Sequence, residues 1–175
     1  MDIDTRITAA AERLFDRAGF NSTGMSRLIR ATGLSSRTVY KHVAGKNALV
    51  GQVLEQRHRR FFDQMSFENI DSVFDALTVW SRAEGSRGCL FFRLQAETGG
   101  QIPDIEIAVS AYHETLRGCL AELVKRHLGH ANEALTDQIL ALFEGATIAS
   151  TYRGLDVIEA ARGAAHTLLS LEAPS

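Results

Sequence analysis

Residues 33–42 read GLSSRTVYKH: a glycine and two serines lead into a short segment with three basic or potentially basic side chains. Gly33 can adopt the left-handed backbone conformation that a tight turn requires. Ser35 is a residue type that caps helix N-termini. The stretch therefore predicts a tight turn followed by a short helix that continues to about Ala44.

The two faces of this predicted helix differ in chemistry. At 100° per residue, Val39 and Val43 fall on one side, where they can pack against neighbouring helices. The opposite arc is polar and carries Arg37, Thr38, Lys41 and His42, with Tyr40 near its border. We expect the valines to anchor the helix and the polar arc to face an external partner.

Two helices are predicted on the N-terminal side of this stretch. Apolar residues recur at i, i+3, i+4, i+7, i+8 and i+11 from Ile7, and Asp4 is the predicted N-cap of that helix. A second, short helix carries Met25, Leu28, Ile29 and Thr32 on one side and stops at Gly33, with Thr23 as its predicted cap. Two short helices joined by a glycine-containing turn match the helix-turn-helix pattern.

Charge is distributed unevenly along the chain. The 175 residues have a net charge of −2, but residues 1–65 hold 11 Lys+Arg against 6 Asp+Glu, and residues 66–175 hold 8 against 15. No acidic residue occurs from Arg17 to Leu54. This concentration of one sign favours a polyanionic partner for the N-terminal segment, with a solvated basic surface as the alternative.

The residue types on the polar arc suit duplex DNA. Arginine and lysine donate to guanine O6 and N7 in the major groove, and threonine can contact a base or a thymine methyl. Tyr40 and His42 suit phosphate oxygens. Lys46 would add its ammonium to a helix N-terminus that already favours anions. We therefore predict that this helix enters a groove of DNA.

From Ile7 to Leu49 the sequence resembles the N-terminal domain of TetR-type transcriptional regulators. The matching residues follow the family's order and spacing: Ile7, Ala10, Leu14, Phe15, Gly19, Phe20, Thr23, Gly33, Leu34, Ser35, Thr38, Val39, Tyr40, His42, Val43, Lys46 and Leu49. The chain departs from the family's usual residues at Ile29, Thr32 and Arg37, and Val43 matches in position but replaces a frequent phenylalanine. The resemblance implies DNA contacts from Thr23, Ser26, Ser35, Ser36, Arg37, Thr38, Tyr40, Lys41, His42 and Lys46.

The rest of the chain predicts further helices, so the expected fold class is all-α with about nine helices. They are expected at 46–65, 69–84, 88–98, 104–129, 132–152 and 155–171, with Gly and Pro residues in the gaps. We place a helix-turn-helix domain at 1–45 and a larger helical domain at 46–175. The resemblance implies that the second domain binds a ligand and dimerises, and Arg87–Phe91 is similar to the start of the family's sixth helix.

Small residues suggest a homodimer through residues 136–171. Glycine and alanine recur there among larger apolar residues, and small side chains let helices approach closely enough to pair as a four-helix bundle. A dimer would read two half-sites of a palindromic operator about 34–36 Å apart. The alternative is an ordinary buried helix pair within one chain.

The candidate ligand pocket consists of aromatic and polar residues on the predicted middle helices. Each has a simpler explanation: the aromatic side chains as core, Arg93 and Glu97 as a surface ion pair at i, i+4, and His113 as a solvated or satisfied histidine. The set is Trp80, Phe91, Arg93, Gln95, Glu97, Tyr112, His113, Phe143 and Tyr152.

Other chemistries are weaker on sequence grounds. Cys89 is a candidate redox or electrophile sensor, with structural burial as the alternative. His127 and His130 have no third metal ligand tied to them by spacing, so no metal or cofactor is expected.

No catalytic motif stands out, and a small helical enzyme or an interaction module is the competing class. Absence of a signal peptide or an apolar span favours the cytoplasm and no membrane.

The family resemblance also implies a two-state mechanism. An unliganded dimer holds its DNA-binding domains at the operator's half-site spacing and blocks transcription. An effector in the C-terminal domain shifts the helix at 46–65, the domains separate, and affinity falls. The sequence does not identify the effector, the operator or the regulated genes, and it leaves open whether the effector releases or promotes DNA binding.

Overall fold

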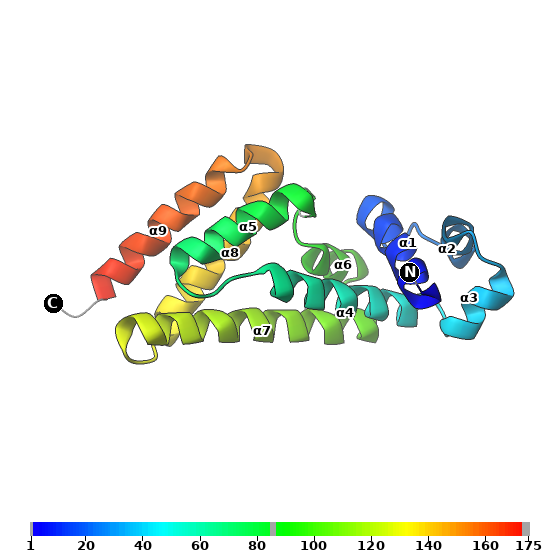
Figure 1. Cartoon of the computed structure of the whole chain (residues 1–175), viewed down its shortest axis with the longest axis horizontal. Helices are drawn as coiled ribbons and strands as arrows, with labels where there is room; N and C mark the ends of the chain where they lie inside the picture. The colour runs from blue at the N-terminus through cyan, green and yellow to red at the C-terminus, as the bar shows by residue number, and fades with distance from the viewer. Residues whose placement is uncertain (1, 85–86, 173–175) are drawn as a thin grey trace. The chain divides into compact units, whose positions relative to one another are not determined.

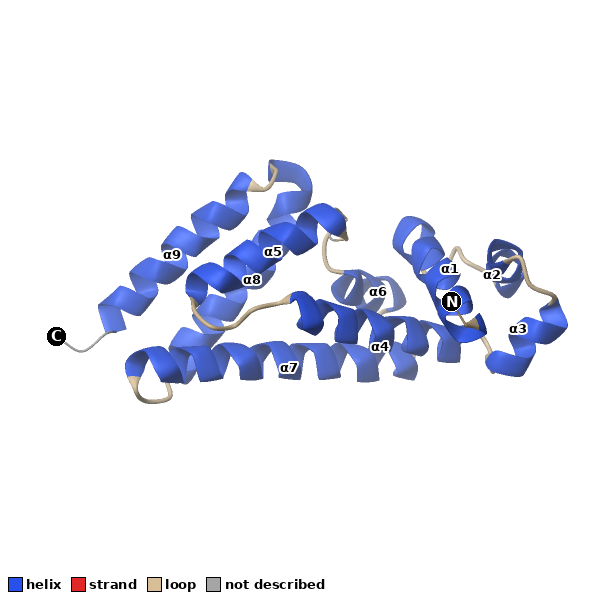
Figure 2. Cartoon of the chain, viewed as in Figure 1, coloured by secondary structure: helices blue, strands red, loops and turns tan. Residues whose placement is uncertain are grey.

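The computed structural model describes residues 2–84 and 87–172. Every regular element of this part of the chain is a helix (Figure 2), which confirms the all-α class. The helices, labelled in Figure 1, are α1 (Ile3–Ala18), α2 (Met25–Thr32), α3 (Ser36–His42), α4 (Lys46–Gln64), α5 (Ile70–Ala83), α6 (Leu90–Thr98), α7 (Pro103–Leu128), α8 (Glu133–Arg153) and α9 (Asp156–Glu172). Within the described residues, no helix is both long enough and apolar enough to cross a bilayer.

All six helices predicted after residue 45 form, and their ends lie within two residues of the predicted positions. Glycines account for several of these ends. Gly99 and Gly100, between α6 and α7, have φ angles of 58° and 72°, which a glycine adopts without the clash that a Cβ would cause. The helix-breaking glycines in the sequence therefore predicted these helix boundaries correctly.

Two predicted N-caps are wrong. Asp2 caps α1 in place of Asp4, because its carboxylate accepts a 2.7 Å hydrogen bond from the Thr5 amide. Asp4 lies within the first turn, where a carboxylate is favoured by the helix dipole. Gly24 occupies the cap position of α2 and has no side chain to form a hydrogen bond, and the buried Thr23 hydroxyl bonds the Gly19 carbonyl instead.

The chain divides into two compact units. One comprises Met1–Arg59 with Leu90–Ala111, and the other comprises Arg60–Cys89 with Tyr112–Ser175. Helix α6 and the first turns of α7 therefore belong with the N-terminal helices, although residues of the second unit precede them in sequence. A functional boundary at residue 45 stays a prediction, since compactness and function need not divide a chain at the same place.

The first unit is organised around α1. Phe15 is completely buried and its ring lies 5.8 Å from that of Phe20. Arg57 of α4 is also buried, and its guanidinium lies 2.6 Å from the Glu12 carboxylate of α1. Because a buried charge without a partner is costly, this ion pair fixes the register of α4 against α1.

The second unit has an aromatic core. The ring of Phe61 lies 5.1 Å from that of Trp80, 5.4 Å from Tyr112 and 6.5 Å from Phe143. Edge-to-face contacts of this kind add to the free energy gained by burial. Helices α5, α8 and α9 pack against one another around this core.

Candidate nucleic-acid interface

Two valines attach α3 to the rest of its unit. Val39 is 0% exposed and Val43 is 3% exposed, as the helical wheel predicts. Val43 ends the helix, and its amide donates a 3.0 Å hydrogen bond to the Val39 carbonyl. Burying both side chains leaves the opposite side of α3 directed away from the core.

The outward side of α3 carries positive charge and an aromatic ring. Ser36, Arg37 and Lys41 are exposed, and Tyr40 is 54% exposed. Within residues 2–84 and 87–172, neither Arg37 nor Lys41 forms an ion pair with a carboxylate. Both cations are therefore available to an external anion or to the edges of DNA bases.

The turn between α2 and α3 is fixed by short-range hydrogen bonds. Gly33 has a φ of 65°, the left-handed conformation that the sequence predicts. The Thr32 hydroxyl donates to the Ile29 carbonyl at 2.7 Å and accepts from the Leu34 amide at 3.1 Å. From α1, Nε of Arg6 donates to the Thr32 carbonyl at 2.7 Å. Thr32, a departure from the family's usual residue, thus stabilises the turn.

Ser35 caps α3 as predicted. Its Oγ accepts a 3.1 Å hydrogen bond from the Thr38 amide and lies 2.8 Å from the Thr38 hydroxyl. A hydroxyl has one donor and two acceptor sites, so both side chains retain capacity for a second partner. Their positions relative to the helix are set before any DNA binds.

His42 is held by an acidic residue of α1. Its Nδ1 lies 2.6 Å from Oδ1 of Asp4, and 26% of the His42 side chain is exposed. Nε2 is therefore the ring nitrogen that a phosphate could reach. The predicted DNA contact by His42 depends on this second nitrogen.

Thr23 and Lys46 both have roles inside the domain. Thr23 is completely buried, and its hydroxyl donates to the Gly19 carbonyl at 2.7 Å, so its side chain closes the α1–α2 loop in place of the predicted phosphate contact. Lys46 Nζ donates to the Phe20 carbonyl at 3.0 Å and lies 3.9 Å from the centre of the Phe20 ring. Its ammonium has three donors, so this bond leaves two for a phosphate. Ser26 is exposed in the first turn of α2.

Residues of α6 hold the same loop from another direction. Both carboxylate oxygens of Glu97 accept 2.8 Å hydrogen bonds, one from the Phe20 amide and one from the Asn21 amide. Nη1 of Arg93 lies 2.8 Å from Oδ1 of Asp16 at the end of α1. The simpler explanation of Arg93 and Glu97 as an ion pair with each other is wrong, because each has a partner in α1 or the loop after it.

Sequence reasoning missed these contacts because 77 and 76 positions separate Glu97 from its two donors. Periodicity relates residues that are close along one helix. The residue type does not indicate which backbone amide a distant side chain will bond. No acidic residue lies in the loop from Gly19 to Gly24, so acceptors for its amides had to come from water or from elsewhere in the chain.

The predicted ligand residues are divided between the two units. Trp80, Tyr112 and Phe143 are buried in the aromatic core of the second unit, as the simpler explanation holds. In the same unit, His113 lies 3.3 Å from Glu144, and Tyr152 is 73% exposed.

The remaining predicted ligand residues belong to the first unit. Phe91 is 2% exposed, and Gln95 donates a 2.9 Å hydrogen bond to Glu106. Three cavities in the described part of the chain are lined by other residues. The ligand site predicted from the sequence stays a prediction.

The two cysteines are half-buried thiols. Burial raises the pKa of the Cys119 thiol, which lowers the thiolate fraction and hence the reactivity. Arg93, a cation four positions after Cys89, is engaged by Asp16. The sensor role of Cys89 stays a prediction that a thiol reagent would test.

Helix α2, the glycine turn after it and α3 with its exposed side define a helix-turn-helix. Residues 7–53 match the model of a family described as bacterial regulatory proteins, tetR family. This match, which lies in the N-terminal part of the chain, confirms the resemblance found in the sequence.

Characterised relatives agree with this assignment. The HTH-type transcriptional regulator UidR of Escherichia coli K12 is 24% identical over 126 residues, which cover 69% of this chain and 64% of that protein. The match thus spans about two-thirds of the chain and slightly less of the curated relative.

Solved structures share the fold over nearly the whole chain. The TetR-family regulator SCO4454 of Streptomyces coelicolor superimposes with a TM-score of 0.89 at 22% identity, covering 98% of this chain and 90% of that one. A TetR-type regulator, sav143, from Streptomyces avermitilis gives a TM-score of 0.84 at 21% identity, covering 98% of both chains. At these identities the likeness establishes the fold.

Proposed function

We propose that this protein is a sequence-specific DNA-binding transcriptional regulator that acts as a repressor in the cytoplasm. The observation that carries the proposal is the arrangement of α3: Val39 and Val43 are buried, and Arg37, Tyr40 and Lys41 point away from the core. A short helix held in this way can lie in the major groove, which is wide enough to admit it.

The residues on the outward side take different roles in this proposal. Arg37 and Lys41 donate to guanine edges, and Thr38 contacts a base or a thymine methyl. Tyr40 donates to a phosphate, and so does Nε2 of His42 when the ring carries a proton on both nitrogens, because Nδ1 donates to Asp4. Additional phosphate contacts come from Ser26, Ser35, Ser36 and the two remaining donors of Lys46. Base contacts supply specificity, whereas phosphate contacts supply affinity that falls with salt.

A homodimer formed through α8 and α9 presents two copies of α3 to a palindromic operator. The small residues of these helices divide into two groups. Ala146, Ala161 and Ala165 are buried within the unit, as an ordinary helix pair requires. The other group is exposed and lies, with larger side chains, along one side of each helix: Ala141, Gly145, Ile148 and Tyr152 on α8, and Ala160, Ala164 and Leu171 on α9.

This exposed apolar surface supports the dimer. Ile148 is 41% exposed, Tyr152 73% and Leu171 75%, and such side chains gain free energy when a partner covers them. Two copies related by a two-fold axis would cover the same surface on both chains and place four helices together. A small-molecule effector then acts by favouring one spacing of the DNA-binding domains over another.

Selection of binding sites from random duplex DNA tests the proposed function. The purified protein should enrich a palindrome whose half-site centres are about 10–10.5 base pairs apart or a multiple of that spacing. A variant with Arg37→Ala and Lys41→Ala should enrich no sequence. Recovery of unrelated sequences by the unaltered protein would show that it binds DNA only through charge, and the proposal would then fail.

A further inference from the structure

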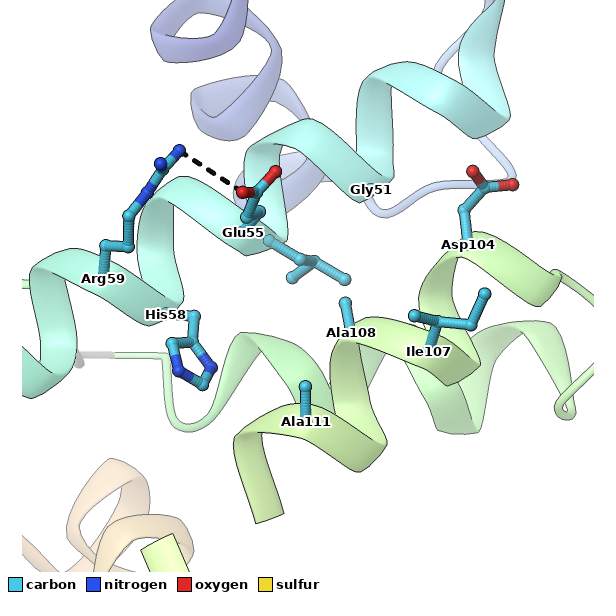
Figure 3. A pocket seen from close by; sticks show the side chains of 9 residues that line it. Gly51, Glu55, His58, Arg59, Asp104, Ile107, Ala108 and Ala111 are labelled. Atoms are coloured by element: carbon cyan, nitrogen blue, oxygen red, sulfur yellow. Dashed lines mark ion pairs between the residues drawn. The ribbon is translucent and has the colours of Figure 1, made fainter. Parts of the chain in front are cut away.

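The first unit contains a groove between α4 and α7, shown in Figure 3, with a volume of about 440 Å³. This volume falls within the range of about 300–1,000 Å³ that is usual for small-molecule sites. The residues that line it come from both helices: Gly51, Leu54, Glu55, His58 and Arg59 from α4, and Asp104, Ile107, Ala108 and Ala111 from α7.

Small residues account for the space. Gly51, Ala108 and Ala111 contribute little side-chain volume, and a Cβ placed on Gly51 would lie 3.3 Å from Cβ of Asp104. Leu54 is completely buried and Ile107 is 71% exposed, so an apolar wall runs from the interior to the mouth. Such a wall suits the hydrocarbon part of a ligand.

The charges at the groove are not balanced. Glu55 has a partner in Arg59, 3.7 Å away in the same helix. Burial first, and then the charge of Arg59, lowers the pKa of His58 below its ordinary 6.5, which keeps its imidazole neutral at pH 7. The Asp104 carboxylate forms no hydrogen bond or ion pair with any residue in the described part of the chain. The groove therefore has an excess of one negative charge.

We propose that this groove is the effector site and that it binds an organic cation: a flat apolar body carrying one ammonium group that pairs with Asp104. Charge complementarity selects this ligand over a neutral or anionic one of the same shape. The site differs from the predicted ligand residues, whose aromatic members fill the core of the second unit. Its role as an effector site rests on the proposed function, whereas its ligand preference does not.

The groove is connected to the DNA-binding helices through α4. Arg57 of that helix pairs with Glu12 at 2.6 Å, and Gln56 accepts a 2.7 Å hydrogen bond from Thr8, so α1 is attached to α4 between groove residues. Lys46, at the start of α4, bonds the Phe20 carbonyl. A ligand that changes the position of α4 against α7 thus changes the support of α1 and the loop that follows it.

Calorimetry with the full chain, in the absence of DNA, tests the ligand class. The probes share one shape and differ in charge: 4-phenylbenzylammonium, 4-phenylbenzyl alcohol and biphenyl-4-carboxylate. We expect the ammonium to bind at least about tenfold more tightly than the alcohol, and the carboxylate most weakly. Equal affinities for the three probes, or no binding by any, would overturn the proposal.

Substitutions locate the binding. Asp104→Asn should lower the affinity for the ammonium to the value for the alcohol. The affinity for the alcohol should not change. The matched control Asp63→Asn, an exposed aspartate of α4 that does not line the groove, should keep the preference. A preference that survives Asp104→Asn contradicts the assignment of the ammonium to this carboxylate.

Filling the groove should abolish binding of both the ammonium and the alcohol. Ala108→Leu places three additional carbons in it, and Ala111→Leu at the exposed mouth serves if the first variant does not fold by circular dichroism. Binding that persists in a folded filled variant overturns the proposal. A filled variant whose mass by light scattering falls from that of two chains to that of one also overturns the proposal. Such a fall would show that a second copy of the chain covers the groove.

The regulatory role is measured with a duplex selected by the protein. The ammonium probe should change DNA affinity by at least about fivefold in the unaltered protein and not in Asp104→Asn. Tight binding of the probe with unchanged DNA affinity would overturn the effector role. If calorimetry shows the expected preference but no duplex is preferred, the proposed function fails and the ligand site stands.

Discussion

The carboxylate of Glu97 accepts a 2.8 Å hydrogen bond from the backbone amide of Phe20, 77 residues earlier in the chain. Its other oxygen accepts from Asn21, so one side chain of α6 satisfies two amides of the loop that leads into the helix-turn-helix. Bonds from a charged acceptor are shorter and stronger than those between neutral groups. Helix α6 is thereby part of the support of the helix-turn-helix.

Replacing Glu97 by Gln should destabilise this loop. A glutamine has one carbonyl oxygen, so one of the two amides loses its acceptor, and the charge is lost as well. We expect a decrease of about 1–2 kcal/mol in the free energy of unfolding and faster hydrogen exchange at the Phe20 and Asn21 amides. Urea unfolding and NMR measure these effects. Glu114→Gln, at an exposed position of α7, is the control and should change neither quantity.

Arg37 should determine which bases are preferred. Arg37→Ala removes the exposed guanidinium near the start of α3, and we expect a loss of about 1–3 kcal/mol in discrimination at particular base pairs. Fluorescence anisotropy with single-base variants of a selected duplex measures this. Arg13→Ala, at an exposed position of α1, should leave discrimination unchanged. Equal losses on the selected duplex and on random DNA would contradict a base contact by Arg37.

Asp71 should make stability depend on pH in acid. The hydrogen bond from Nε2 of His166, 2.8 Å away, and the nearby charge of Arg162 hold the pKa of this carboxyl below its ordinary 3.8. A pKa depressed by folding contributes stability above the unfolded value, and that contribution disappears as pH falls through the folded value. Urea unfolding between about pH 5 and about pH 2.5 should show a larger loss for the unaltered protein than for Asp71→Asn. If both proteins lost the same free energy of unfolding as the pH falls, Asp71 would not contribute to the pH dependence.

Ala164 tests the dimer. It is exposed on α9 within the proposed interface, and Ala164→Arg would place a charge without a partner between two apolar surfaces. We expect the dissociation constant to rise at least about 100-fold, so that light scattering at micromolar concentration gives the mass of one chain. Ser110→Arg, at an exposed position of α7, should retain the mass of two chains. A dimer that survives Ala164→Arg would place the interface elsewhere.

Local patterns in the sequence predicted most of the fold. The spacing of Val39 and Val43 predicted which side of α3 is buried, and Gly33 and Ser35 predicted the turn and the cap, because each depends on residues a few positions apart. The N-caps at Asp4 and Thr23 were wrong because neighbouring residues of suitable type compete for one position.

Long-range partners could not be predicted in this way. Arg93 was assigned to a ligand site, and only the packing of α6 beside α1 reveals its pairing with Asp16. Similarly, the aromatic residues around Trp80 suit a pocket and a packed core equally well on composition, and the distances between rings decide for the core. The groove along Gly51 and Ala108 also depends on the tertiary packing of two helices.

The most direct test of the central claim, that the exposed side of α3 recognises base sequence, is a salt titration of binding to two duplexes. One carries the palindrome selected by the protein, and the other carries the same bases in scrambled order. Anisotropy should show a preference of about 10³-fold or more for the palindrome at physiological salt, with both affinities falling as salt rises. Equal affinities for the two duplexes across the titration would contradict the account.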